Sequence, residues 1–245
     1  MRFQEEINGL YVDAEYSDEG VEQIFLPLLH RLTALQKEKN RRILVFLAAP
    51  PGAGKSTLVR FLKYLSENTP DLTPVTAIGI DGFHMYRDHL SSHTVMRDGQ
   101  ELLLASIKGA SVTYDLAHME ERLGRIAAGE DCGWPEYSRQ IHDPVEDAVT
   151  VSGDIVLLEG NYLLLEEAGW KDLRKYADLT VRIDTDPEKV RERLIRRKMN
   201  NGISYEEAAS YVERSDFYNI RACLEHSARA DLNLFMTDDG VYELR

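Results

Sequence analysis

Short apolar runs alternate along this chain with segments in which apolar positions recur at helical spacing. The runs have the length of strands and are apolar at nearly every position, which is typical of strands buried on both faces. They lie at residues 43–49, 75–80, 155–158, 179–183 and 232–236.

Helical spacing first appears before the earliest of these runs, where apolar residues from Val21 to Leu35 predict an N-terminal helix over residues 18–41. Further helices are predicted at residues 55–65, 115–128, 170–176, 186–200 and 204–226. Strands that alternate with helices predict a single α/β domain over residues 1–245, with a mostly parallel sheet and helices on both of its faces. A ligand of such a sheet binds at the carboxyl ends of the strands.

Three segments carry little periodic signal. Residues 1–17 are acidic and weakly periodic, residues 85–113 have the composition of loops and short helices, and residues 132–149 are irregular, with two prolines. The last two segments are where a pocket for a second substrate is expected, so the pattern leaves the identity of that substrate open.

The first apolar run leads into Ala49-Pro-Pro-Gly-Ala-Gly-Lys-Ser-Thr57, which opens a helical pattern. Strand, glycine-rich turn and helix in this order are the layout of a phosphate-binding P-loop, in which backbone N–H groups converge on a polyanion. Lys55 is expected to reach the β- and γ-phosphates, and the Ser56 hydroxyl to ligate Mg²⁺. Ala49 replaces the first glycine of the motif, which is tolerable if its φ is negative; the alternative is an ordinary glycine-rich turn. The predicted nucleotide-binding residues are Pro51, Gly52, Ala53, Gly54, Lys55, Ser56 and Thr57.

Two carboxylates follow other predicted strands. Asp81 ends the run after the P-loop helix and could accept a proton from an attacking hydroxyl; the alternative is a turn or helix-capping aspartate. Glu159 follows residues 155–158 and could hold Mg²⁺ beside Ser56; the alternative is a surface glutamate at a strand end.

Basic residues gather in the predicted helix over 186–200, which carries six of them between Lys189 and Lys198. Arg193, Arg196 and Arg197 share a helical face and could close over a triphosphate as a lid within residues 185–220; the alternative is a solvated face paired with neighbouring glutamates. Four further residues are candidates for contacts with a hydroxylated or acidic small molecule: His84, Tyr137, Arg139 and His142.

The chain has 29 basic and 42 acidic residues, a net charge of −13, which argues against general binding to nucleic acid or anionic membranes. Cys132 and Cys223 have no metal-binding or redox spacing and indicate free thiols in a reducing compartment. With neither a signal peptide nor a membrane-spanning run in the sequence, a cytoplasmic protein is expected.

Taken together, these motifs resemble the phosphoribulokinase/uridine kinase/pantothenate kinase family, most closely its bacterial nucleoside kinase-like, fructose-transport-associated branch. The resemblance is carried by residues 49–57, Asp81-Gly-Phe-His84, Tyr137-Ser-Arg139, His142-Asp-Pro144, Leu158-Glu-Gly-Asn-Tyr162 and the Arg-rich helix that leads to Asp216 and Asn219. It implies a P-loop NTPase three-layer sandwich with an Arg-rich helical lid that uses ATP and Mg²⁺. Asp81 matches the catalytic base, Arg193 and Arg197 fall in the lid, and related kinases are often homodimers.

The predicted function is therefore transfer of the γ-phosphate of ATP to a hydroxyl of a sugar, nucleoside or pantothenate-like metabolite. Tyr137-Ser-Arg139 differs from the Tyr-Ser-His of uridine kinases, which weakens the case for uridine. A regulatory P-loop NTPase that acts on a protein partner is the alternative. A GTPase is disfavoured because the chain has no Asn-Lys-x-Asp motif.

Overall fold

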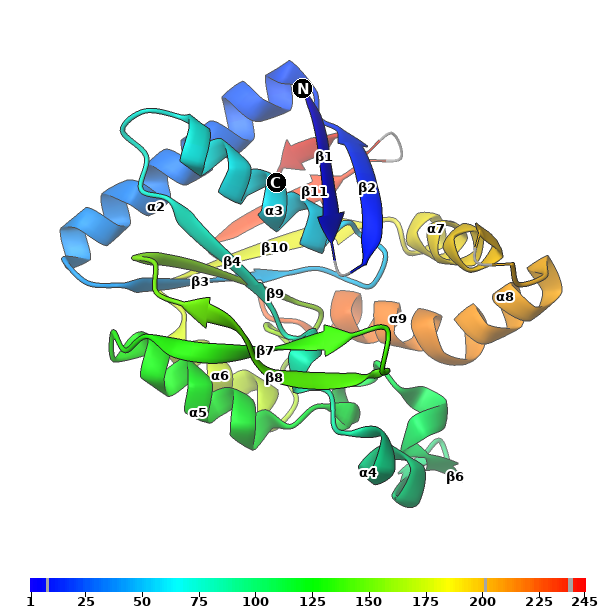
Figure 1. Cartoon of the computed structure of the whole chain (residues 1–245). Helices are drawn as coiled ribbons and strands as arrows, with labels where there is room; N and C mark the ends of the chain where they lie inside the picture. Colours follow the sequence, from blue (N-terminus) through cyan, green and yellow to red (C-terminus); the bar gives the residue numbers. More distant parts are fainter. Residues whose placement is uncertain (8, 201, 238–239) are drawn as a thin grey trace.

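A six-stranded sheet runs through the computed structural model of the chain, which describes residues 1–7, 9–200, 202–237 and 240–245 (Figure 1). The strand order is β12-β11-β10-β3-β9-β4, and every neighbouring pair is parallel except β11 and β12. The prediction of a mostly parallel sheet is confirmed. The strands are β3 (Ile43–Ala48), β4 (Val75–Gly79), β9 (Ile155–Gly160), β10 (Leu179–Thr185), β11 (Leu232–Met236) and β12 (Tyr242–Leu244).

Helices cover both faces of this sheet because the buried strands point apolar side chains in both directions. Ile43, Val45 and Leu47 of β3 belong to one core, and Leu44 and Phe46 belong to the other. The first core is closed by α2 (Leu26–Lys39) and α3 (Lys55–Asn68), and the second by α5 (Leu116–Ala127) and α6 (Trp170–Leu173).

The predicted N-terminal helix is continuous from Asp18 to Lys39, as α1 (Asp18–Gly20), a π-helical turn (Val21–Phe25) and α2. Ser17 caps its start by accepting a hydrogen bond from the Gly20 N–H, and Asn40 ends it in a left-handed conformation.

A helical arm projects beyond the carboxyl ends of the strands (Figure 1). It consists of α7 (Pro187–Asn200), α8 (Tyr205–Tyr211), a π-helical turn (Val212–Asp216) and α9 (Phe217–His226). These elements occupy the predicted lid region over residues 185–220, of which residue 201 lies outside the described residues. None of the described helices is long and apolar enough to cross a membrane.

No helix or strand is predicted within residues 1–17, and that omission is wrong. They form an antiparallel hairpin of β1 (Arg2–Ile7) and β2 (Leu10–Glu15) that lies beside α3 (Figure 1). Phe3 packs edge-on against Phe61 of α3, with ring centroids 5.5 Å apart. The strand was missed because only Phe3 and Ile7 of β1 are buried, so its apolar alternation is incomplete.

The expectation of an irregular segment over 132–149 is also wrong. This segment forms a second hairpin of β7 (Cys132–Ser138) and β8 (Asp143–Val151). An irregularity between Trp134 and Glu136, at Pro135, interrupts the alternation of β7, and most of β8 is exposed. Within residues 85–113 the structure contains α4 (Arg87–Ser92) and a short hairpin of β5 (Thr94–Arg97) and β6 (Gln100–Leu103).

Candidate active site

The glycine-rich turn after β3 places its backbone at the start of α3. Gly52 and Gly54 have φ angles of 83° and 76°, and Gly54 precedes the first residue of α3, Lys55, with no side-chain cap. The N–H groups of the first turn are therefore available to an anion, and the helix dipole favours one. Ala49 is 3% exposed and is not among the residues with positive φ, so the alanine causes no backbone strain in the turn.

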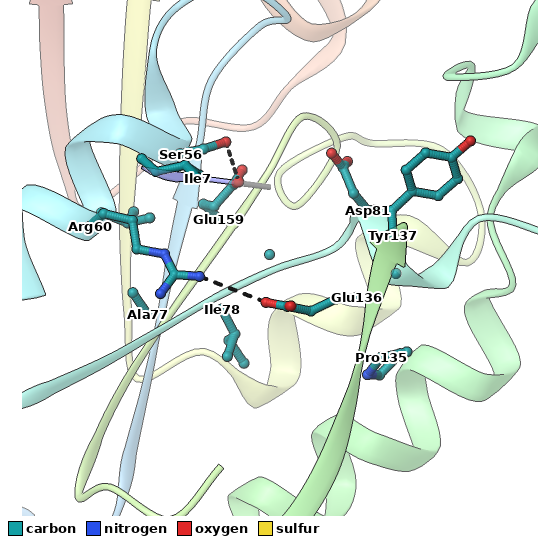
Figure 2. Close-up of a pocket in the computed structure, with 13 residues that line it drawn as sticks. Ile7, Ser56, Arg60, Ala77, Ile78, Asp81, Pro135, Glu136, Tyr137 and Glu159 are labelled. Atoms are coloured by element: carbon teal, nitrogen blue, oxygen red, sulfur yellow. Dashed lines mark hydrogen bonds and ion pairs between the residues drawn. The ribbon is translucent and has the colours of Figure 1, made fainter. Parts of the chain in front are cut away.

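A buried carboxylate, that of Glu159, lies next to the first two residues of α3. The Ser56 hydroxyl donates a 2.6 Å hydrogen bond to Oε1 of Glu159 (Figure 2). Lys55 Nζ lies 4.0 Å from Oε2 of the same carboxylate. Glu159 is 7% exposed. Burial raises the pKa of Glu159 above its ordinary value, although Lys55 acts in the opposite direction. Glu159 is therefore a strand-end carboxylate inside the site, and the alternative of a surface glutamate is wrong.

These oxygen donors fit magnesium. A hydroxyl and a carboxylate side by side are ligands that Mg²⁺ accepts, and the ion usually takes its remaining ligands from water and nucleotide phosphates. Among the described residues no group of three or more His, Cys, Asp or Glu could hold a metal by itself. Ser56 and Glu159 would thus hold the ion together with a bound triphosphate.

Asp81 lies on the other side of the same space. It follows β4 in a 3₁₀ turn (Asp81–Phe83) and points into the region between Glu159 and Tyr137 (Figure 2). The turn packs so closely on β7 that a Cβ atom on Gly82 would lie 2.0 Å from the carbonyl oxygen of Pro135. A glycine after Asp81 is therefore what allows this carboxylate to stand against the β7–β8 hairpin.

Glu159, Ser56 and Asp81 line one small cavity, and a larger cavity of about 410 Å³ joins Ser56 and Asp81 to the glycine-rich turn. Its wall contains most of the predicted P-loop residues, two of the three arginines predicted for the lid (Arg196 does not line it) and three of the predicted catalytic or acceptor residues. They are Pro51, Gly52, Gly54, Lys55, Ser56, Thr57, Asp81, His84, Arg139, Arg193 and Arg197. Ala53 is fully buried beneath the turn, and its N–H donates to the Pro50 carbonyl oxygen at 3.2 Å.

The predicted acceptor residues are only partly brought together. His84 is buried and stacks on Tyr114 with ring centroids 4.0 Å apart, and burial lowers its pKa. Tyr137 and Asp81 line a smaller cavity of about 30 Å³ next to the large one. His142 is exposed in the turn between β7 and β8 with a φ of 58°, and it does not line either cavity.

Several residues of the cavity wall were not identified from the sequence. Ile7 and Val12 come from the N-terminal hairpin, for which the sequence pattern predicted no strand. Asn161 lies in the quoted Glu-Gly-Asn-Tyr segment, and its carboxamide oxygen is buried without a hydrogen-bond partner among the described residues. An orphaned buried oxygen in a cavity wall is a group that a polar ligand can satisfy. The remaining wall residues that were not predicted for the site are Gly109, Tyr114 and Leu194, together with Asp216 and Asn219, which the sequence singled out only as part of the family resemblance.

Known proteins share this architecture. A family model, the phosphoribulokinase / uridine kinase family, matches residues 44–236. The uncharacterized protein YggC of Escherichia coli (strain K12) is 40% identical over 243 residues, which are 99% of this chain and 98% of that protein. A Schizosaccharomyces pombe protein provisionally named a uridine kinase is 30% identical over 213 residues, covering 84% of this chain and 88% of its own length. The crystal structure of a Silicibacter sp. TM1040 protein, provisionally described as a fructose transport system kinase, superposes with a TM-score of 0.70 at 27% identity, over 82% of this chain and 98% of that chain.

Proposed function

The chain belongs to the phosphoribulokinase / uridine kinase family, and from this premise we propose that it is an ATP-dependent kinase of a small metabolite. The acceptor would be a hydroxyl of a sugar, a nucleoside or a pantothenate-like alcohol. The observation that carries the proposal is that Asp81 shares one cavity with Lys55, Ser56 and the glycine-rich turn.

In the proposed reaction Asp81 orients the acceptor hydroxyl and takes its proton. As the acceptor oxygen bonds to the γ-phosphorus, the bond to the β–γ bridging oxygen breaks and ADP leaves. Lys55 offsets the negative charge on the transferring group, and backbone N–H groups of the turn hold the other phosphates. Mg²⁺ held by Ser56 and Glu159 would supply further positive charge to the triphosphate.

Arg193 and Arg197 complete the site from α7. Both line the cavity, and both stand on the arm beyond the strand ends. Cations placed there would stabilise the charge that develops during transfer, and the arm would exclude water that competes with the acceptor.

The test is acceptor-stimulated ADP release over a panel of sugars, nucleosides and pantothenate, with Asp81→Asn as the variant. We expect Asp81→Asn to retain ATP binding and to lose most of the stimulated turnover, about 10²-fold or more, because general-base catalysis contributes that much. Asp88→Asn is the matched control, since Asp88 is exposed on α4 and lies outside the cavity. Unchanged turnover in Asp81→Asn, or turnover that only a protein partner stimulates, would contradict the proposal.

A further inference from the structure

The N-terminal hairpin contributes to the site although it lies outside the part of the chain that the family shares. The family model matches residues 44–236, whereas the hairpin ends with β2 at Glu15. Ile7 of β1 and Val12 of β2 nevertheless line the large cavity, and Ile7 also lines the small one. Membership of the family therefore does not explain what this hairpin does at the site.

Aromatic contacts fix the hairpin to α3. Alternate residues of a strand share a face, which puts Phe3 and Ile7 together on the buried face of β1. Phe3 packs edge-on against Phe61 of α3, and the Tyr16 ring, just after β2, stacks on Phe61 with ring centroids 4.0 Å apart. From this anchor β1 runs toward the beginning of α3, where Ile7 shares the wall of the small cavity with Ser56. The position of Ile7 is therefore set by packing on the P-loop helix.

Ile7 lies where the metal side and the acceptor side of the proposed site meet. Ser56 and Glu159, which would hold the magnesium ion, line the small cavity of about 30 Å³, and Asp81 lines it as well. Ile7 lies beside Ser56 and Glu159 in Figure 2 and is 7% exposed. A cavity of this size has room for water, and the carboxylates in its wall offer hydrogen bonds to it. A water molecule held there would be next to the proposed catalytic base.

Water competes with the acceptor because both offer an O–H group to the γ-phosphorus. When water attacks, its oxygen bonds to the γ-phosphorus, the bond to the β–γ bridging oxygen breaks, and its proton passes to Asp81. The products are ADP and inorganic phosphate. Among the described residues of the hairpin, those in the cavity walls are Ile7 and Val12, whose side chains neither donate nor accept a hydrogen bond. The hairpin therefore offers nothing that would hold an attacking water in place.

We propose that the N-terminal hairpin makes the site selective for its alcohol acceptor over water, with Ile7 as the positioning residue. The Ile7 side chain occupies space next to Ser56 and Asp81 that a hydrolytic water would need, and the aromatic contacts with α3 hold it there. This inference rests on the proposed kinase function and adds a determinant of specificity to it. An aliphatic group at this position excludes water, so its removal raises hydrolysis of ATP.

The experiment measures the release of inorganic phosphate from Mg²⁺-ATP in the absence of any acceptor. We expect Ile7→Ser to raise this rate about 10-fold over wild type, roughly the effect of one hydrogen bond gained by the attacking water. Ile7→Val stays aliphatic and should recover the wild-type rate to within about 2-fold, because it offers the water no hydrogen bond. Combining Ile7→Ser with Asp81→Asn should remove the rise, since the water uses the same base as the acceptor.

Tyr11→Ser is the matched control in the same hairpin. Tyr11 is 71% exposed and lines neither cavity, so its substitution should leave phosphate release unchanged. Val12→Ser provides a second test, since Val12 is half-buried and lines only the large cavity. We expect a smaller rise from it, about 3-fold, because a hydroxyl there is farther from the attacking water. It also tests the inference if thermal unfolding shows that Ile7→Ser has lost its fold.

Unchanged phosphate release in folded Ile7→Ser or Val12→Ser, with acceptor-stimulated turnover intact, would overturn the inference and leave the proposed function standing. Equal rises in Ile7→Ser and Tyr11→Ser would overturn it as well, because loosening of the hairpin would then be sufficient. A parallel fall of phosphate release and stimulated turnover would overturn it by reducing Ile7 to a packing role. If no compound of the panel stimulates ADP release from the wild type, the proposed function and the inference fail together.

Discussion

Asp81 can stand against the β7–β8 hairpin only because a glycine follows it. The side chain of any other residue at position 82 would overlap the Pro135 carbonyl oxygen, which lies 2.0 Å from the Cβ position. We expect Gly82→Ala to push the 3₁₀ turn away from β7 and to lower kcat about 10²-fold, the effect of misplacing a reacting group by roughly 1 Å. Acceptor-stimulated ADP release measures the loss, and titration with ATP should give a nearly unchanged Kd.

Gly124→Ala is the control for this substitution. Gly124 lies in α5, where the nearest atom to a new Cβ is the Tyr176 hydroxyl at 3.8 Å, so alanine should be neutral or slightly stabilising. Wild-type turnover in Gly82→Ala would mean that the position of Asp81 does not matter for the reaction.

If Glu159 helps to hold magnesium as proposed, we expect the affinity for the metal to depend on pH. A carboxylate must lose its proton to ligate a metal, and burial raises the pKa of Glu159 above the ordinary 4.5. The affinity for Mg²⁺-ATP should therefore be full above that raised pKa and should fall as the pH is lowered through it, beginning above 4.5. Calorimetric titrations between pH 5 and 8 would measure the fall.

The γ-phosphate of ATP also takes up a proton near pH 6, in wild type and variants alike. Glu159→Gln removes only the contribution of the protein, so the difference between the two pH profiles isolates it. Identical profiles for wild type and Glu159→Gln would show that this carboxylate does not act on the metal.

At the scale of the elements, the sequence predicted the strands that are buried on both faces of the sheet. Strand β3 is buried at all six positions and β9 likewise, so each appears as a continuous apolar run between helices. The antiparallel hairpins β1–β2 and β7–β8 gave no such run. In β1 only Phe3 and Ile7 are buried, and β7 has an irregularity at Pro135, so neither shows a clear alternation. Both hairpins are held by contacts with distant elements, which a local pattern does not contain.

Two neighbouring arginines of α7 allow a test of whether the arm acts as a lid over the nucleotide. Arg196 and Arg197 are both exposed, but only Arg197 lines the cavity. Loss of a cation that stabilises the transferring phosphoryl group typically costs about 10²- to 10³-fold in kcat, and we expect this of Arg197→Met. Arg196→Met, with the same change of charge and helix propensity, should stay within about 2-fold, because surface charges are screened. Equal effects of the two substitutions on steady-state kcat would contradict a specific role for the lid.

At the scale of the whole molecule, the site is assembled from almost the full length of the chain. Its wall begins at Ile7 in the first strand and ends at Asn219 in α9. The sequence located the residues that sit in motifs or at strand ends, such as Lys55, Asp81 and Glu159. It did not assign Ile7 or Asn219 to the site, because their place in the wall follows from how the hairpin and the arm pack. Ile7 lies in no motif, and Asn219 was singled out only as part of the family resemblance.

A cavity built in this way should couple nucleotide binding to the stability of the entire fold. A ligand at about 100 times its Kd stabilises the native state by about 2.7 kcal/mol. For a chain of this size that corresponds to a rise in Tm of roughly 5–10 °C, which differential scanning calorimetry with Mg²⁺-ATP would detect as one cooperative transition.

Lys55→Met should abolish most of this rise, because its ammonium is the P-loop cation of the cavity. Lys63→Met is the matched control in the same helix, since Lys63 pairs with Glu67 on the surface at 3.6 Å and should leave the rise intact. A rise confined to one of two separate transitions would show that the hairpin, the sheet and the arm do not respond as one unit. The nucleotide would then stabilise only the P-loop side, and the wall contributed by Ile7 and Asn219 would not take part in binding.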